Sequence, residues 1–164
     1  MDLYIIRHAW AGQYGDPAWP NDSDRPLTDE GRARFAEMSK KLMECGVGPR
    51  LIATSPMVRC VQTAQVLAKA VGGGAEVVQR EELLPGGDPE GLFVWTAKQA
   101  RHHDEIAWVG HAPDVGLLAA AVLGLGEGWL HFSKGAVAAI RFDDSLRSGR
   151  GELRWLVTAK VLGC

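Results

Sequence analysis

The chain has few cysteines, no long apolar run and almost no net charge, and each of these absences excludes a class of protein. Cys45, Cys60 and Cys164 are odd in number and contain no Cys-x-x-Cys pair, so they indicate neither a disulfide framework nor a zinc site. The longest apolar run, residues 115–125, is too short to cross a bilayer. A net charge of -2 argues against nucleic acid as a partner.

The start of the chain also lacks the features of a secretory signal peptide. Met1, Asp2 and Leu3 provide no cationic region, and no small-residue cleavage site follows. We therefore expect a cytoplasmic protein that binds no membrane. Hydrophobic residues make up 46% of the sequence and charged residues 23%, which is typical of a folded globular chain. With 164 residues, residues 1–164 are expected to form one domain that buries roughly 70% of its unfolded surface without disulfides or metal.

Apolar patterning predicts strands that alternate with helices. In residues 1–123, strands are expected at 3–6, 51–53, 76–78 and 106–109, and helices at 29–45, 56–71, 89–100 and 113–123. Two further strands, 136–142 and 152–157, are expected to form an antiparallel hairpin. This order predicts an α/β fold with three layers: a mainly parallel sheet with helices on both faces and a C-terminal antiparallel hairpin.

Residues between the predicted strands and helices indicate where the helices begin. Thr28 is expected to cap the first helix, Ser55 and Pro56 to open the second, and Asp88 to cap the third. Residues 10–26, rich in Gly, Pro, Trp and Asp, form a longer connection than most, and long loops of this kind are often functional.

Two histidines and an arginine are predicted to follow three of the parallel strands. His8 stands directly after the first strand, Arg59 lies in the first turn of the second helix, and His111 directly follows the fourth strand. The carboxyl ends of parallel strands share one edge of the sheet, where ligands of open α/β sheets bind. Such a set is improbable for packing alone, and it predicts a pocket for an anion.

The residue types in this set suit a phosphate group. Arginine offers a planar fork of donors, and helix N-termini add backbone N–H groups. Because the pKa of histidine is about 6.5, a neutral His8 has a free ring nitrogen at pH 7 while a backbone acceptor holds the other N–H, so His8 is the candidate nucleophile. Arg7, Arg59 and His111 would stabilise the charge of the transferring phosphoryl group, so no metal or other cofactor is expected.

Histidines also occur together at 102–105, His-His-Asp-Glu, which could be taken for a metal cluster. Adjacent histidines at a helix end point in different directions, so they cannot readily share one metal ion. A solvated turn is therefore favoured, and no metal site is predicted.

Short motifs in this chain follow the order that is found in the histidine phosphatase superfamily. They are Arg7-His8-Ala9, Arg25-Pro26-Leu27-Thr28 with Gly31, Ser55-Pro56-x-x-Arg59-x-x-Gln62-Thr63, Glu82 ahead of Gly86-Gly87-Asp88, and Val109-Gly110-His111. Over nearly its whole length the chain resembles this superfamily, with its phosphoglycerate mutase-like fold, and in particular the SixA-type phosphohistidine phosphatases. Ala9 stands where the family motif more often has glycine, and alanine disfavours a positive φ there.

The resemblance implies a covalent phosphohistidine intermediate on His8. It also implies that Arg7, Arg59 and His111 line the phosphate pocket, with Arg25 as an additional contact. These side chains would bind and stabilise the phosphoryl group during transfer.

The general acid is the least defined member of the site. In the larger phosphoglycerate mutase relatives a glutamate in the loop after the third strand protonates the leaving oxygen, and Glu82 matches that glutamate in order and context. Asp22 and Asp24, in the long first loop, are rival acids. A phosphohistidine substrate weakens the need for an acid, because an imidazole protonated on its far nitrogen leaves as a neutral group.

The interval between Arg59 and His111 is short, and it has room for one helix-strand-helix-strand passage but no helical lid. The pocket is therefore expected to be open, and to admit a phosphorylated histidine of a protein partner such as a phosphotransfer domain, with inorganic phosphate as the product. Two alternatives stay open. One is a small-molecule phosphomonoesterase or mutase on the same scaffold, and the other is a catalytically idle phosphate-binding module.

Overall fold

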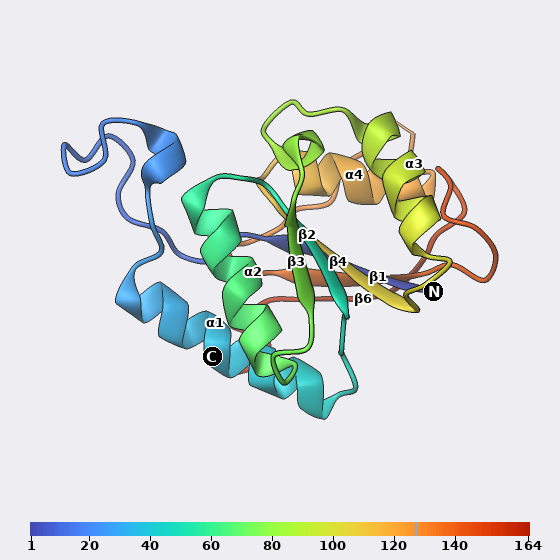
Figure 1. Cartoon of the computed structure of the whole chain (residues 1–164), viewed down its shortest axis with the longest axis horizontal. Helices are drawn as coiled ribbons and strands as arrows, with labels where there is room; N and C mark the ends of the chain where they lie inside the picture. The colour runs from blue at the N-terminus through green and yellow to red at the C-terminus, as the bar shows by residue number, and fades with distance from the viewer. Residues whose placement is uncertain (127) are drawn as a thin grey trace.

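The computed structural model describes residues 1–126 and 128–164, and within them a six-stranded sheet lies between two layers of helices (Figure 1). The strands are β1 (Asp2–Arg7), β2 (Leu51–Thr54), β3 (Glu76–Gln79), β4 (Glu105–Gly110), β5 (Val137–Arg141) and β6 (Glu152–Val157). The helices are α1 (Asp29–Glu44), α2 (Val58–Ala70), α3 (Pro89–Gln99) and α4 (Asp114–Leu123), with short 3-10 helices η1 (Asp22–Asp24) and η2 (Glu81–Leu83). The predicted three-layer α/β fold is confirmed.

The strands are ordered β3-β2-β4-β1-β5-β6 across the sheet. The pairs β2–β3, β2–β4 and β1–β4 are parallel, whereas β5 runs antiparallel to β1 and β6 antiparallel to β5. The C-terminal hairpin is therefore confirmed. Because β4 lies between β1 and β2, the carboxyl ends of these three strands are adjacent.

The core lies on both faces of the sheet because β1 alternates its apolar side chains between them. Leu3 and Ile5 belong to the cluster that packs with α3 and α4, whereas Tyr4 and Ile6 belong to the cluster that packs with α1 and α2. All four are 5% exposed or less. Full burial of one such side chain stabilises the fold by about 1.5–3 kcal/mol, so the sheet that carries the strand ends is firmly held.

Helix boundaries mostly follow the predicted caps. Thr28 accepts a hydrogen bond from the Gly31 amide at the start of α1, and Asp88 caps α3. The prediction for the second helix was wrong: α2 begins at Val58, and Ser55 lies outside it in the turn after β2. None of the helices in the described ranges is long and apolar enough to cross a membrane.

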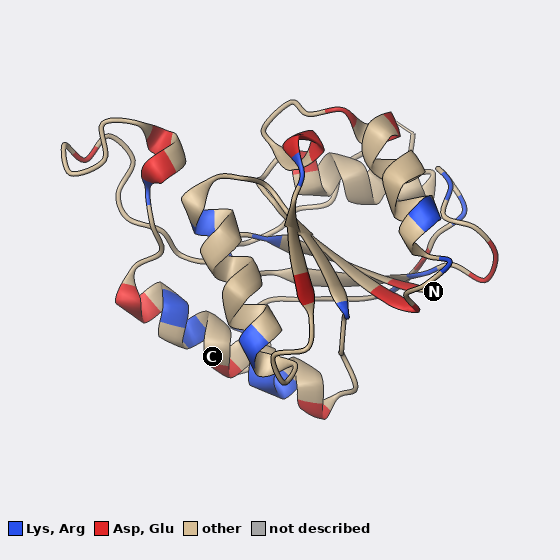
Figure 2. Ribbon diagram, in the orientation of Figure 1, with Lys and Arg blue, Asp and Glu red and all other residues tan. Residues whose placement is uncertain are grey.

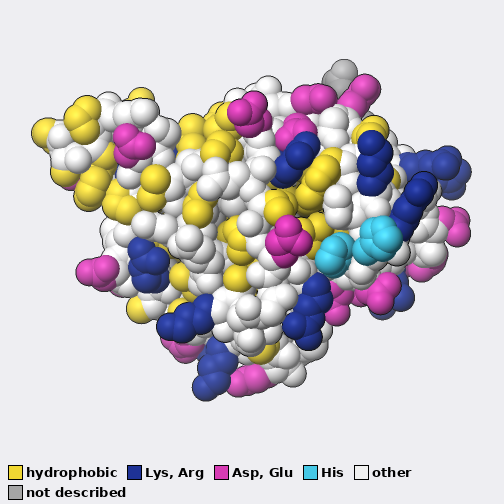
Figure 3. Space-filling view, in the orientation of Figure 1, with side chains coloured by type: hydrophobic (Ala, Val, Ile, Leu, Met, Phe, Trp, Pro, Cys, Tyr) yellow, Lys and Arg dark blue, Asp and Glu magenta, His cyan; other side chains and the backbone are white. Residues whose placement is uncertain are grey.

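The connection between β1 and α1 projects from the body of the molecule beside α2 (Figure 1). Its base is closed by an antiparallel bridge between Ala11 and Leu27, and η1 lies on its returning half. Hydrophobic side chains gather on this projection in the space-filling view (Figure 3), and Tyr14 is 77% exposed. The acidic residues of η1 are immediately followed by a basic residue, as Figure 2 shows.

Candidate active site

The backbone brings three strand ends together at one edge of the sheet. The His8 amide donates to the Gly110 carbonyl at 2.9 Å, and the Ser55 amide donates to the Val109 carbonyl at 2.9 Å. The imidazole centroids of His8 and His111 are 5.4 Å apart, with an angle of 61° between the ring planes. The two histidines therefore meet at the predicted edge, although their roles stay predictions.

His8 is a buried, neutral imidazole with one defined tautomer. Its Nδ1 is 2.8 Å from the Ala9 carbonyl oxygen, which can only accept, so Nδ1 carries the proton and Nε2 holds a free lone pair. Burial lowers the pKa of His8 to about 3; the hydrogen bond to Ala9 opposes this shift, and the charges of Arg59 and Arg7 add to it. His8 is thus unprotonated at neutral pH.

The alanine after His8 fits the turn. Ala9 is fully buried, its amide donates to Thr63 Oγ1 at 3.0 Å, and only glycines have a positive φ among the described residues. The turn therefore needs no glycine, and the Ala9 carbonyl stays directed at the His8 ring.

His111 is neutral as well, with the opposite tautomer. Arg59 Nη2 lies 3.3 Å from its Nδ1, and because a guanidinium only donates, Nδ1 accepts and Nε2 carries the proton. Nε2 then donates to Ser55 Oγ at 2.9 Å. Burial, followed by the charge of Arg59, lowers the pKa of His111 to about 4, while Asp114 and Asp22 oppose the shift.

Two arginines present buried donors at this edge. Arg59 is 4% exposed, and Arg7 donates from Nη1 to the Phe132 carbonyl at 2.7 Å. The Nε atoms of both arginines are buried and have no hydrogen-bond partner within the described residues. An unpaired buried donor costs about 1–3 kcal/mol, so each of these two groups would gain from an acceptor within reach.

Arg25 approaches the same edge from the long loop. Its Nε donates to Asp22 Oδ1 at 2.8 Å and its Nη1 to the Gly12 carbonyl at 2.9 Å. The other carboxylate oxygen of Asp22 lies 3.0 Å from Arg59 Nη2, so Asp22 joins the two arginines. Partial burial acts to raise the pKa of Asp22, but hydrogen bonds and charges of Arg25 and Arg59 outweigh it and lower the pKa.

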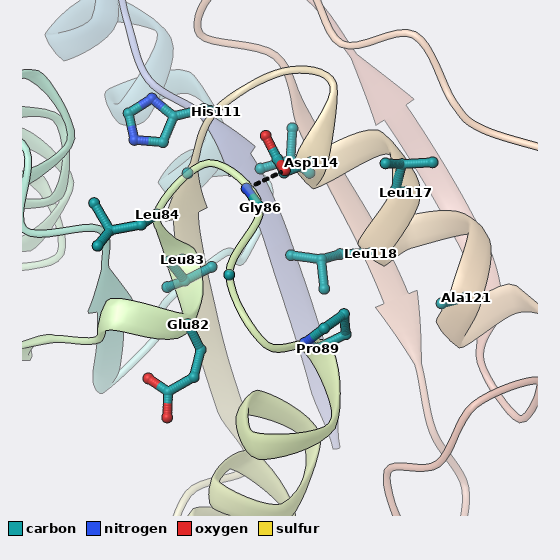
Figure 4. A pocket seen from close by; sticks show the side chains of 13 residues that line it. Glu82, Leu83, Leu84, Gly86, Pro89, His111, Asp114, Leu117, Leu118 and Ala121 are labelled. Atoms are coloured by element: carbon teal, nitrogen blue, oxygen red, sulfur yellow. Dashed lines mark hydrogen bonds between the residues drawn. The ribbon is translucent and has the colours of Figure 1, made fainter.

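None of the candidate acids forms a hydrogen bond with His8 in the part of the chain that the structure describes. Glu82 forms an ion pair with Arg80, and its side chain points away from His111 in the close-up view (Figure 4). Asp22 is ionised and engaged by arginines, and Asp24 is an exposed residue that accepts a hydrogen bond from Ser23. The acid role of Glu82 stays a prediction; Glu82 pairs with Arg80 and lines the same cavity as His111.

A cavity of about 300 Å³ adjoins His111, between the loop at 82–89 and α4 (Figure 4). Its walls are mainly apolar and include Leu84, Leu117 and Leu118. The Gly86 amide donates to Asp114 Oδ1 at 2.9 Å, which ties the loop to the start of α4. The cavity can therefore receive an apolar portion of a ligand that binds beside His111.

Sequence reasoning missed two residues that contact His111. Ser55 is predicted only as a helix cap, yet its hydroxyl accepts from the ring. Cys60 lies with Sγ 3.4 Å from His111 Nε2, and burial raises the pKa of its thiol to about 12, so it stays protonated. The available signal was that Ser55 and Cys60 lie in the same short segment, 55–63, as Arg59.

No group of three or more His, Cys, Asp or Glu residues is arranged to hold a metal ion in the part of the chain that the structure describes. The positive charge at the site is supplied by the guanidinium groups of Arg7, Arg25 and Arg59. These groups are suited to bind the oxygens of a tetrahedral anion.

Comparison with known proteins agrees with this geometry. The sequence profile of the histidine phosphatase superfamily (branch 1) matches residues 3–159, and the chain belongs to this family. Its sheet order and antiparallel C-terminal pair are those of the phosphoglycerate mutase-like fold.

Within the family, the chain is similar to SixA proteins. It is 31% identical to phosphohistidine phosphatase SixA of Escherichia coli over 160 residues, which cover 94% of this chain and 92% of that protein. It is 36% identical over 124 residues to an uncharacterised protein of Picosynechococcus sp., covering 74% of this chain and 73% of the relative. A solved structure of the protein histidine phosphatase SixA complexed with tungstate superposes with a TM-score of 0.86 at 26% identity, covering 99% of both chains.

Proposed function

We propose that this protein is a metal-independent phosphatase that removes the phosphoryl group from a phosphohistidine of a protein partner. The observation that carries the proposal is the state of His8. Its Nδ1–H is held by the Ala9 carbonyl, its pKa of about 3 keeps it neutral, and its Nε2 keeps a free lone pair. A neutral imidazole of fixed orientation is suited to attack phosphorus.

The reaction has two steps. In the first, the Nε2 lone pair of His8 forms a bond to phosphorus while the bond from phosphorus to the substrate nitrogen breaks, and the leaving imidazole keeps its electron pair. In the second, the oxygen of water bonds to phosphorus while the bond to His8 Nε2 breaks; His8 keeps that electron pair, and both protons of the water stay on the product, which leaves as dihydrogen phosphate. Arg7, Arg59 and Arg25 bind the phosphoryl oxygens in both steps and stabilise charge through positioned donors.

A phosphohistidine substrate fits the pairing of Glu82 and Asp22 with arginines. An imidazole that already carries a proton on its far nitrogen departs as a neutral group, whereas an alkoxide requires a proton at its oxygen. Glu82 is engaged by Arg80 and Asp22 by two arginines. Similarity to SixA over 94% of the chain supports the same substrate class, and the tungstate that its relative binds is a tetrahedral oxyanion like phosphate.

The apolar cavity beside His111 favours a second candidate. A space of about 300 Å³ with leucine walls can hold the body of a small phosphomonoester. A phosphatase or mutase acting on such a metabolite would use the same His8 chemistry.

A substrate panel separates the candidates. Initial rates would be compared for a phosphorylated phosphotransfer domain, phosphoglycerate, a sugar phosphate and an aryl phosphate. We expect the largest kcat/KM with the phosphohistidine protein, loss of that activity in His8→Ala, and full activity in His102→Ala, which alters an exposed histidine. A higher kcat/KM with a small phosphomonoester would contradict the protein substrate. If the protein bound phosphate but turned over none of these substrates, the result would favour the remaining alternative, a catalytically idle phosphate-binding module.

A further inference from the structure

Asp22 makes a two-point contact with Arg59 that no step of the proposed reaction uses. Its backbone carbonyl accepts from Arg59 Nη1 at 2.8 Å, and its carboxylate lies 3.0 Å from Arg59 Nη2. The second carboxylate oxygen accepts from Arg25 Nε at 2.8 Å. One residue of the projecting loop therefore binds both arginines, one from its own loop and one from α2.

The arrangement fixes the orientation of Arg59 from the solvent side. The Asp22 side chain is 35% exposed and that of Arg59 only 5%, so the carboxylate stands on the outer side of the guanidinium. On the other side Arg59 Nη2 contacts His111 Nδ1, and the buried Nε has no partner within the described residues. Contacts on two sides leave the guanidinium little freedom to rotate.

We propose that Asp22 is a positioning residue, which holds Arg59 in the orientation that binds a phosphate oxyanion. The assignment rests on the proposed function, because it assumes that Arg59 binds the phosphoryl group. A guanidinium that is ordered before the anion arrives loses no side-chain freedom on binding. The single negative charge of Asp22 is shared with Arg25, so the three side chains together stay cationic and still attract an anion.

Removal of the Asp22 carboxylate could change the affinity for phosphate in either direction, and each direction corresponds to a different role of Asp22. If the carboxylate acted mainly as a competing anion, its removal would free Arg59 and tighten phosphate binding. If it positions the guanidinium, its removal weakens binding. The sign of the change in affinity therefore distinguishes the two roles.

The experiment is calorimetric titration of the full chain with inorganic phosphate, which requires no turnover. Asp22→Asn should weaken phosphate binding about tenfold, the order of one charge-assisted hydrogen bond. Asp16→Asn is the matched control: this carboxylate lies in the same loop and accepts from the Ala18 amide, away from the arginines, and its loss should leave the affinity unchanged. Thermal unfolding of both variants establishes that they fold.

A double-mutant cycle tests whether Asp22 acts through Arg59. In an Arg59→Lys background, Asp22→Asn should weaken phosphate binding by a clearly smaller factor than in the unsubstituted protein. An equal factor in both backgrounds, or unchanged or tighter binding by the folded Asp22→Asn protein, would overturn the assignment. Failure of the unsubstituted protein to bind phosphate would contradict the proposed function itself, and the assignment with it.

Discussion

Acidification should destabilise this protein through its two buried histidines. Burial lowers the pKa of His8 to about 3 and that of His111 to about 4 in the folded chain. In the unfolded chain both return to about 6.5, so the unfolded state binds more protons from about pH 6.5 down to about pH 4 for His111 and about pH 3 for His8. The free energy of unfolding is therefore highest above about pH 6.5 and falls as the pH is lowered through this window.

The size of the loss can be worked out at pH 5. That pH is about 1.5 units below the unfolded pKa and above both folded values, and one unit corresponds to about 1.36 kcal/mol. Each histidine should then cost about 2 kcal/mol of stability at pH 5, or about 4 kcal/mol together. This is a large part of the 5–15 kcal/mol that is usual for a folded domain.

Urea unfolding in phosphate-free buffer at several pH values between about 7 and 5 measures this loss as the change in unfolding free energy. In the His8→Ala protein the loss between these pH values should be about 2 kcal/mol smaller, whatever the stability of the variant at pH 7. His102→Ala, which removes an exposed histidine, is the control and should keep the full loss. A free energy that stays constant down to pH 5, or the same loss in His8→Ala, would refute the reasoning.

Three further predictions concern the site. Arg59→Ala should weaken binding of phosphate or vanadate by about 2 to 5 kcal/mol, because it leaves a largely desolvated anion without its partner, and unchanged inhibition by vanadate would contradict this. EDTA should leave the rate unchanged, since guanidinium groups supply the positive charge, and a loss that magnesium restores would speak against it. Glu82→Gln tests the acid: if Glu82 protonates the leaving oxygen, the variant should slow cleavage of an alkyl phosphate far more than cleavage of an aryl phosphate, and equal losses on both would show that Glu82 acts in another way.

The fold could be predicted well because its signals are local. The apolar run at 3–6 predicts a strand buried on both faces, and Thr28 predicts the start of α1, since both depend on neighbouring residues. The proximity of His8 and His111 could be predicted because the carboxyl ends of parallel strands share one edge of the sheet.

The contacts that shape the site could not be predicted in the same way. Ser55 has the sequence context of a helix cap, but its hydroxyl binds His111, 56 residues away along the chain. Asp22 joins Arg59 across 37 residues, and the pairing of Glu82 with Arg80 depends on the turn at η2. Side-chain pairing across a fold leaves no periodicity in the sequence, so these partners emerge only from the structure.

The central claim is that His8 carries the phosphoryl group as a covalent intermediate. Its most direct test is rapid quenching during turnover of a labelled phosphohistidine protein, followed by mass-spectrometric localisation of the phosphate. We predict acid-labile phosphate on the imidazole of His8, and neither turnover nor incorporation in a folded His8→Ala protein. Normal turnover by that variant, or acid-labile phosphate found on His111 instead, would contradict the account.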